Sequence, residues 1–298
     1  MAARMAADKT ARKKHTQALR ENVAHVLFAL AACICILAVA LICLFLLING
    51  IPAMAEIGLP EFLFSTTWRP TADQFGVLTM IIGSLYVTAG AIILGVPLGL
   101  LCALFLSRFA SRRVARLIRP GVELLAGIPS IVYGFFGLVV LVPIIRNSFD
   151  VQGMSILTAA IILGVMILPT IITVSQAALD AVPEHYYEGA LALGANHERC
   201  VFRIVLPAAL SGIMAAVILG VGRAIGETMA VVMIIGNQAR IPASILDGAR
   251  TLTGNIVLEM GYAADLHRGA LIATAVVLFV FILIINLLFS VLKRRARL

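Results

Sequence analysis

Six long apolar segments run through the 298-residue chain and restrict it to folds that lie within a membrane. Each segment reaches the roughly 20 residues that a helix needs to cross the hydrocarbon core of a bilayer. Because lipid offers the backbone no hydrogen-bonding partner, these segments must be helical. The sequence therefore predicts an all-α membrane protein with six transmembrane helices, at about residues 26–48, 78–106, 122–146, 154–179, 209–235 and 269–292.

The charged residues, only 13% of the chain, indicate how the helices are oriented. Three basic clusters lie on the same side of the membrane by parity, together with the loop 180–208, whereas the opposite loops 49–77, 147–153 and 236–268 have no such cluster. Cytoplasmic loops are enriched in Lys and Arg, so we expect both termini in the cytoplasm. The net charge of +8 then reflects topology rather than binding to nucleic acid. The clusters are Lys9, Arg12, Lys13, Lys14 and Arg20 in the leader; Arg108, Arg112, Arg113, Arg116 and Arg119 in the second loop; and Lys293, Arg294, Arg295 and Arg297 in the tail.

We expect three parts along the chain. Residues 1–25 form a basic cytoplasmic leader, residues 26–76 hold the first transmembrane helix and an external loop, and residues 77–298 form the main transmembrane domain. The first apolar run is too long for the core of a signal peptide, which takes about 7–15 residues, so we expect it to be retained as a helix. The five cysteines lie in apolar runs or on the cytoplasmic side, and we expect no disulfide among them.

The external loops hold two features of interest. Trp68, the single tryptophan, is expected to be an aromatic anchor at the membrane interface, with a contact to a partner protein as the alternative. The last external loop, Asn237 to Arg268, is long for a connector, and loops of that length are often functional. It is a candidate surface for a soluble protein that carries a substrate.

A charged pair lies inside the fifth apolar segment. Arg223 is expected about 20 Å from the cytoplasmic end of that helix, where insertion of an arginine costs roughly 2.5–3.5 kcal/mol. Glu227 follows at i+4, so both side chains should share one face and partly neutralise each other. Two interpretations remain open: an ion pair that fixes the helix against a second subunit, or an arginine that attracts a passing anion and is held in place by Glu227.

The third apolar segment opens with ELLAGIPSIVYG, residues 123–134. Here Glu123, Pro129 and several small residues gather near the cytoplasmic end of a transmembrane helix. A helix surrounded only by lipid has no need of a carboxylate or a proline at this depth. We therefore place Glu123 with Arg223 and Glu227 in a candidate substrate pathway.

The polar stretch between the fourth and fifth apolar segments predicts two short helices beside the membrane. Pro183 is suited to start the first helix and Gly194 to end it. Tyr187, Ala190 and Leu191 should share one face of that helix. Asn196 is expected to cap a second helix that runs through Ile204 until Pro207 ends it.

This stretch resembles the EAA loop of ABC importer permeases, E-A-A-x3-G-x9-I-x-L-P, and we call residues 183–207 the EAA-like loop. Only Gly189 departs from that pattern, where the family usually has alanine. The resemblance implies that the loop is a coupling helix that seats on a cytoplasmic ATPase. The residues that it assigns to coupling are Tyr187, Glu188, Gly189, Ala190, Gly194, Ile204, Leu206 and Pro207.

ELLAGIPSIVYG, the segment GRAIGETMAV at 222–231 and Phe75-Gly76 together resemble the phosphate ABC transporter permease family of PstC type. Gly83-Ser84-Leu85 stands where that family is expected to have Gly-Thr-Leu, a small departure. The resemblance implies a type I importer (MetI-like) permease fold in the cytoplasmic membrane and transport of inorganic phosphate. It also implies three partners: a second permease subunit of PstA type, a dimeric ABC ATPase of PstB type and an external phosphate-binding protein of PstS type.

The chain has no G-x4-G-K-[ST] phosphate loop, so ATP hydrolysis is expected in a separate partner chain. Its five histidines show no spacing typical of metal ligands, and we expect neither a cofactor, nor a metal site, nor an enzyme. Two alternatives to phosphate import remain open. One is a permease for another oxyanion, such as phosphonate, sulfate or molybdate. The other is a secondary anion carrier that works without ATP and so has no need of a docking loop.

Overall fold

The computed structural model describes the backbone of residues 2–295 and the side chains of 21–288, 290 and 291. The basic side chains expected in the leader and in the tail lie outside the described residues. Within the described part, six helical segments are long and apolar enough to cross a membrane, which confirms the predicted number. They are Glu21–Ile57, Leu78–Phe109, Ser130–Phe149, Ile156–Asp180, His197–Gly226 and Asp265–Leu288.

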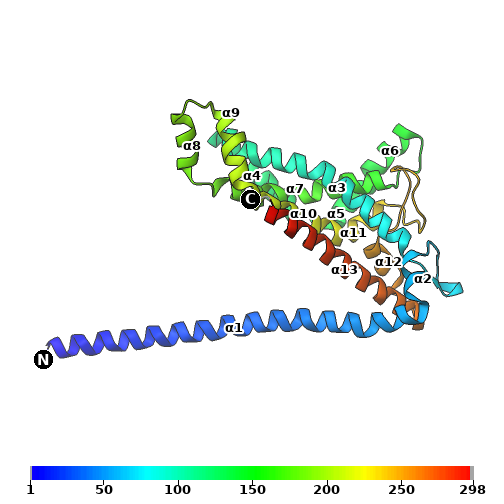
Figure 1. Ribbon diagram of the computed structural model, residues 1–298, viewed down its shortest axis with the longest axis horizontal. Helices are drawn as coiled ribbons and strands as arrows, with labels where there is room; N and C mark the ends of the chain where they lie inside the picture. The colour runs from blue at the N-terminus through cyan, green and yellow to red at the C-terminus, as the bar shows by residue number, and fades with distance from the viewer. Residues whose placement is uncertain (1, 296–298) are drawn as a thin grey trace.

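The first helix stands apart from most of the bundle. Helix α1 (Ala2–Ile57) is joined to the rest at its C-terminal end, where it packs against α13 (Asp265–Arg295), and its N-terminal part extends away from the other helices (Figure 1). Gly50 allows that approach, because a Cβ at this position would lie 2.7 Å from Cγ2 of Val276. The apolar residues between Val26 and Ile48 are mostly exposed, as expected of a helix whose surroundings are lipid.

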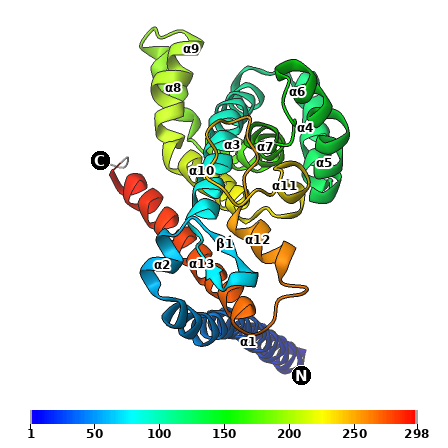
Figure 2. The same ribbon diagram turned by 90° about the vertical axis from the view of Figure 1, so that its right-hand side faces the viewer.

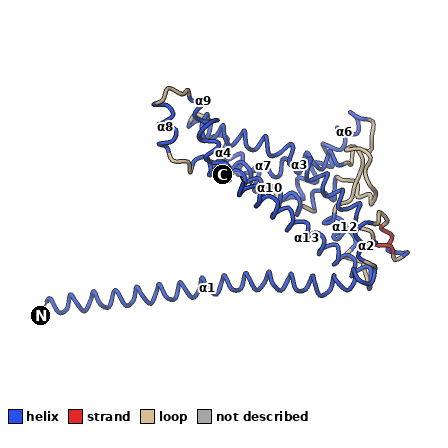
Figure 3. The backbone as a smooth tube through the Cα atoms, in the orientation of Figure 1, coloured by secondary structure: helices blue, strands red, loops and turns tan. Residues whose placement is uncertain are grey.

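A small strand pair follows α1 at the same end of the molecule (Figure 3). After the short helix α2 (Leu59–Phe64), strands β1 (Trp68–Arg69) and β2 (Gln74–Phe75) pair antiparallel around the 3-10 turn η1 (Pro70–Ala72). Trp68 pairs with Phe75, and their rings meet edge to face at 5.4 Å. This end of the molecule therefore has its own apolar cluster, built on Phe62, Trp68 and Phe75.

The centre of the bundle consists of α3 (Leu78–Leu104), α7 (Ile156–Asp180) and α10 (Leu206–Gly226), as Figure 2 shows. The α3–α7 crossing is close because α3 presents glycines there. A Cβ at Gly95 would stand 2.7 Å from the side chain of Ile167 and 2.8 Å from the carbonyl oxygen of Gly164. Small residues allow two helices to approach this closely in a membrane.

Three π turns interrupt the helices. They are η2 (Phe105–Phe109) after α3, η3 (Gly137–Leu141) between α5 (Ser130–Phe136) and α6 (Val142–Phe149), and η4 (Val201–Val205) between α9 (His197–Cys200) and α10. Turn η4 corrects one prediction, since the helix does not end at Pro207 but continues from His197 to Gly226. A proline ring clashes with the carbonyl group four residues earlier in a regular α-helix, and the wider π turn just before Pro207 removes this conflict.

Two of the predicted transmembrane helices are broken. The segment expected over 122–146 consists of α4 (Arg112–Gly127) and α5, separated at Ile128 and Pro129, which are both extended. Residues before a proline avoid the helical region, which explains the break. The segment expected over 209–235 ends as α10 at Gly226, and α11 (Met229–Ile234) begins after Glu227 and Thr228.

The last predicted external loop contains a buried helix. Helix α12 (Leu252–Glu259) lies within 236–268, and Leu252, Thr253, Gly254 and Asn255 are all buried. The segment before it is also ordered, because the amide of Ala249 donates to the carbonyl oxygen of Ile235 at 3.1 Å. Only part of this loop is therefore exposed at the surface of the molecule.

Candidate functional site

The break after α10 separates the two charged residues of the fifth segment. Glu227 is extended, at φ −70° and ψ 129°, so the expected i, i+4 geometry with Arg223 does not form. Its Oε1 accepts hydrogen bonds from the amides of Thr228 and Ala230, at 3.1 and 3.3 Å, and so caps α11. The predicted mutual neutralisation is wrong: among the described side chains, the ion pairs are those of Glu259, and Arg223 takes part in none. Arg223 is exposed.

The helices that follow the two breaks, α5 and α11, pack against each other. Gly134 of α5 packs directly on α11, where a Cβ at this glycine would stand 2.8 Å from Cα of Ala230. The Tyr133 hydroxyl donates to the carbonyl oxygen of Leu125 at 2.8 Å and so connects α5 to α4 across the break. Arg223 lies on α10, one helical turn before the second break. Tertiary packing thus brings together the two sequence motifs, 123–134 and 222–231.

Glu123 lies elsewhere. It is an exposed residue of α4 that lines two cavities, and neither cavity includes Arg223 or Glu227. The structure therefore brings motifs 123–134 and 222–231 into contact. It does not place Glu123 in a cavity with Arg223 or Glu227.

The EAA-like loop has the predicted turn chemistry and projects from one end of the bundle (Figure 1). Helix α8 (Glu184–Ala192) is followed by Gly194 at φ +84°, and the amide of Gly194 donates to the carbonyl oxygen of Leu191 at 2.9 Å. The Asn196 side chain accepts a hydrogen bond from the amide of Arg199 at 3.0 Å, as expected of a cap. Both local predictions are confirmed.

The residues that the resemblance assigns to coupling differ in how far they are exposed. Ala190 is buried and Tyr187 half-buried, whereas Leu191, expected on the same face, is 41% exposed. Glu188, Gly189, Gly194 and Pro207 are exposed, and Ile204 and Leu206 are intermediate. A docking element is expected to expose some residues to its partner while others pack against the bundle. Here Glu188, Gly189 and Gly194 are exposed, and Ala190 and Tyr187 pack inward.

Aromatic residues that spacing alone did not reveal support this loop. The Tyr187 hydroxyl and Nδ1 of His197 form a hydrogen bond of 2.7 Å between α8 and α9. The His197 ring meets that of Phe109 edge to face at 4.8 Å, which connects the loop to the end of α3 through η2. Nearby, Arg108 donates to the carbonyl oxygen of Leu179 at 2.7 Å. No sequence pattern indicates the contacts of Phe109 and Arg108, because their partners His197 and Leu179 lie far along the chain from them.

Residues 95–298 match the model of the family described as the binding-protein-dependent transport system inner membrane component. The chain belongs to this family. It is similar to the probable ABC transporter permease protein YqgH of Bacillus subtilis, at 40% identity over 87% of each chain. It is also 35% identical to the phosphate transport system permease protein PstC of Mesorhizobium japonicum, over 90% of this chain and 88% of the relative.

Solved structures place the fold among ABC importer permeases. A chain of the MetNI methionine ABC transporter, in an inward-facing conformation, superposes with a TM-score of 0.58 at 21% identity over 77% of this chain and 99% of its own length. A chain of a bacterial ABC transporter involved in the import of the acidic polysaccharide alginate gives a TM-score of 0.54 at 19% identity, over 85% of this chain. The protein is a multi-pass inner-membrane permease subunit and not an enzyme, and its family implies an ATPase and partner subunits.

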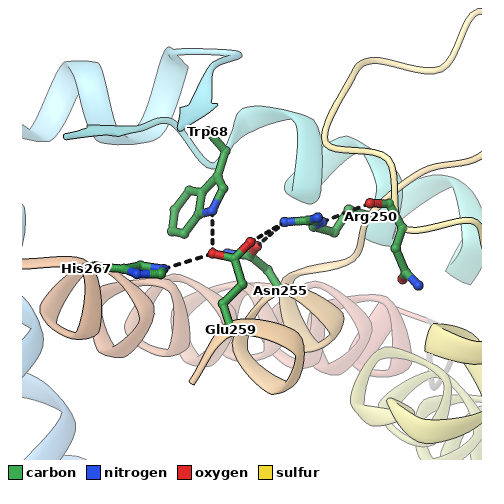
Figure 4. A network of polar contacts seen from close by, with 6 residues as sticks. Trp68, Arg250, Asn255, Glu259 and His267 are labelled. Atoms are coloured by element: carbon green, nitrogen blue, oxygen red, sulfur yellow. Dashed lines mark hydrogen bonds and ion pairs between the residues drawn. The ribbon is translucent and has the colours of Figure 1, made fainter. Parts of the chain in front are cut away.

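The opposite end of the permease is held together by one buried carboxylate (Figure 4). Glu259 is 6% exposed, and its Oε2 accepts a hydrogen bond from the Trp68 indole at 2.8 Å. The same oxygen lies 2.9 Å from Nε2 of His267, and Oε1 pairs with Arg250 at 2.6 Å. Trp68 is only 8% exposed, so the expectation that it anchors the protein at the membrane interface is wrong. Its indole instead satisfies a buried charge.

Helix α12, which holds Glu259, also contacts the helix break between α10 and α11. Arg250 also donates to Asn255 of α12 and to the carbonyl oxygen of Asn237, each at 3.1 Å. On the same helix α12, the Thr253 hydroxyl donates to the carbonyl oxygen of Glu227 at 3.4 Å. Helix α12 thus contacts the strand pair through Glu259 and, separately, the residue that separates α10 from α11 through Thr253.

Proposed function

We propose that this permease is the PstC-type subunit of an ABC importer that moves inorganic phosphate across the cytoplasmic membrane. Relatives named as phosphate transport system permease proteins support the substrate. The observation that carries the proposal is Arg223, a guanidinium inside the bilayer segment without an ion pair among the described residues, one helical turn before the break that separates α10 from α11. An arginine at this depth is costly unless its charge is used, and guanidinium matches the oxygens of phosphate.

The proposed orientation places the EAA-like loop and both termini in the cytoplasm. The loop then seats in a groove on a dimeric ATPase of PstB type through Glu188, Gly189 and Gly194. A second permease of PstA type completes the passage, and a phosphate-binding protein of PstS type approaches from the side of the Glu259 network. Exposed Ile241 and Ile245, at 48% and 59%, provide apolar contact there.

In this proposal Arg223 attracts the anion and Glu227 holds the start of α11 in place. Glu227 no longer acts by pairing with Arg223, because its carboxylate is bound to the amides of Thr228 and Ala230. Glu123 belongs to the cytoplasmic mouth rather than to the middle of the pathway, since it lies on α4 before the break. The proposed division remains a leader at 1–25, the first helix with its external segment at 26–76 and the transport domain at 77–298.

ATPase activity of the assembled complex tests the proposal. The four proteins are reconstituted in nanodiscs, and hydrolysis is measured with binding protein loaded with phosphate, phosphonate, sulfate or molybdate. Stimulation by phosphate alone supports the proposal. Stimulation by another of these anions instead of phosphate would assign the permease to that anion, and anion uptake that persists after ATP depletion would indicate a secondary carrier.

A further inference from the structure

Helix α4 carries a line of charged side chains along one face. Arg112, Arg116, Arg119 and Glu123 follow one another at i, i+4, i+7 and i+11, a spacing that keeps residues on one side of a helix. All four are exposed, and within the described part of the chain the three arginines have no ion pair. We call these four residues the α4 stripe. It holds three positive charges and one negative charge.

The stripe lines a cavity that is open at the surface. This cavity of about 410 Å³ is bounded by all four stripe residues, with Ala115 and Pro120 between them. A second cavity of about 240 Å³ shares Arg119 and Glu123 with the first. Its other walls are mostly apolar side chains of α4, η2 and α7, namely Leu106, Val122, Ile172 and Ala177, with Thr173 and Gln176. A basic cavity therefore continues into a largely apolar one.

Another face of α4 presents large apolar side chains to the surroundings. Leu117 is 80% exposed and Leu124 is 73% exposed. A helix with arginines on one face and exposed leucines on another is typical of the membrane interface, where the apolar side enters the acyl region and the basic side meets anionic headgroups. The helix lies at the same end of the bundle as the EAA-like loop but on a different flank (Figures 1 and 2).

We propose that the α4 stripe binds the headgroup of an anionic phospholipid. The three guanidinium groups take the phosphate, the Glu123 carboxylate accepts a hydrogen bond from a headgroup hydroxyl, and the adjoining cavity takes the glycerol and the start of an acyl chain. Inorganic phosphate uses the same arginines but has no group for the apolar cavity. A protein partner would have to cover the exposed Leu117 and Leu124 of α4, and α4 lies on a flank separate from the EAA-like loop (Figure 2). The inference goes beyond the proposed transport of phosphate and stands without it.

Lipid binding by the purified full-length chain tests this inference. Native mass spectrometry or a fluorescent lipid titration compares phosphatidylglycerol with phosphatidylcholine. We expect the Arg116→Gln variant to bind phosphatidylglycerol about fivefold more weakly, the loss expected for one basic residue at an anionic surface, and the triple variant R112Q/R116Q/R119Q to lose the preference. Arg113→Gln is the matched control, because it removes the same charge from the same helix outside both cavities.

Three outcomes would overturn the inference. An equal loss in Arg113→Gln would show that diffuse charge attracts lipid without a site. Displacement of phosphatidylglycerol by submillimolar inorganic phosphate would assign the stripe to the free anion. Loss of bound lipid when the ATPase or the second permease is added would make the stripe a protein interface. If the triple variant does not fold, the three single variants decide, each checked by size-exclusion chromatography.

Discussion

The Tyr187 hydroxyl and Nδ1 of His197 lie 2.7 Å apart and join the two short helices of the EAA-like loop. Because His197 also packs against Phe109 at the end of η2, directly after α3, this one hydrogen bond connects α8 of the EAA-like loop to a transmembrane helix. A load applied to the exposed surface of α8 can therefore reach the bundle through side chains as well as through the backbone.

Tyr187→Phe should weaken this connection. Removing the hydroxyl costs about 0.5–1.5 kcal/mol, the net value of an ordinary hydrogen bond, and should reduce the coupling of ATP hydrolysis to substrate. The ratio of ATPase activity with and without loaded binding protein measures the effect. Tyr186→Phe is the control, since Tyr186 is 49% exposed and its change removes the same atom from the same helix. Equal loss in both variants would exclude a special role for the Tyr187 hydroxyl.

Gly194→Val should uncouple the permease from its ATPase. Gly194 has φ +84°, a left-handed conformation that costs other residues roughly 1–2 kcal/mol, and more for a β-branched side chain. We expect less ATPase to co-purify and transport to fall. Gly189→Ala is the matched change, because its Cβ would meet nothing within 4 Å and the position is helical. Undiminished co-purification with Gly194→Val would mean that the loop is not the docking element.

Arg223→Gln should abolish phosphate uptake while the complex still assembles. Loss of a charge-assisted hydrogen bond of about 1.5–3 kcal/mol predicts a fall of about tenfold or more in anion-stimulated ATPase activity. Arg240→Gln, an exposed arginine of the segment before α12, is the control and should behave as the parent does. Normal uptake by Arg223→Gln would remove this residue from the pathway.

Gly134→Ala should push α5 away from α11. The new methyl group would stand 2.8 Å from Cα of Ala230, and forced overpacking of this kind typically costs about 1–3 kcal/mol. A lower thermal unfolding temperature and reduced transport are expected. The same substitution at Gly127, whose Cβ would meet nothing within 4 Å, controls for the change itself. If both variants unfold at the same temperature, the contact between α5 and α11 at Gly134 is not tight.

Glu259→Gln should destabilise the end of the molecule that holds the strand pair. The substitution leaves Arg250 and His267 beside a neutral amide, and removing one partner of a buried pair costs about 3–5 kcal/mol. Thermal unfolding in detergent measures the loss. Glu56→Gln, an exposed glutamate near the end of α1, should be close to neutral. A neutral result for Glu259→Gln would show that the network contributes little to stability.

Local chemistry was predictable where neighbouring residues decide it. The number of helices follows from apolar length, and Gly194 and Asn196 end and begin helices because of their own backbone and side-chain preferences. The same reasoning failed at Pro207. The π turn just before it removes the clash between the proline ring and the preceding turn, so the helix continues. The reasoning also failed at Glu227, because the i, i+4 rule holds only if the helix continues.

The sequence by itself determined that this chain crosses the membrane six times and offers an EAA-like loop, because length, hydropathy and short motifs are properties of adjacent residues. Only the tertiary structure decided that the helices after the two breaks touch at Gly134 and Ala230, that Trp68 binds Glu259 across 191 residues of chain, and that the α4 stripe opens into an apolar cavity. These relationships depend on which helix faces which. Packing of whole elements sets that choice, and no local pattern encodes it.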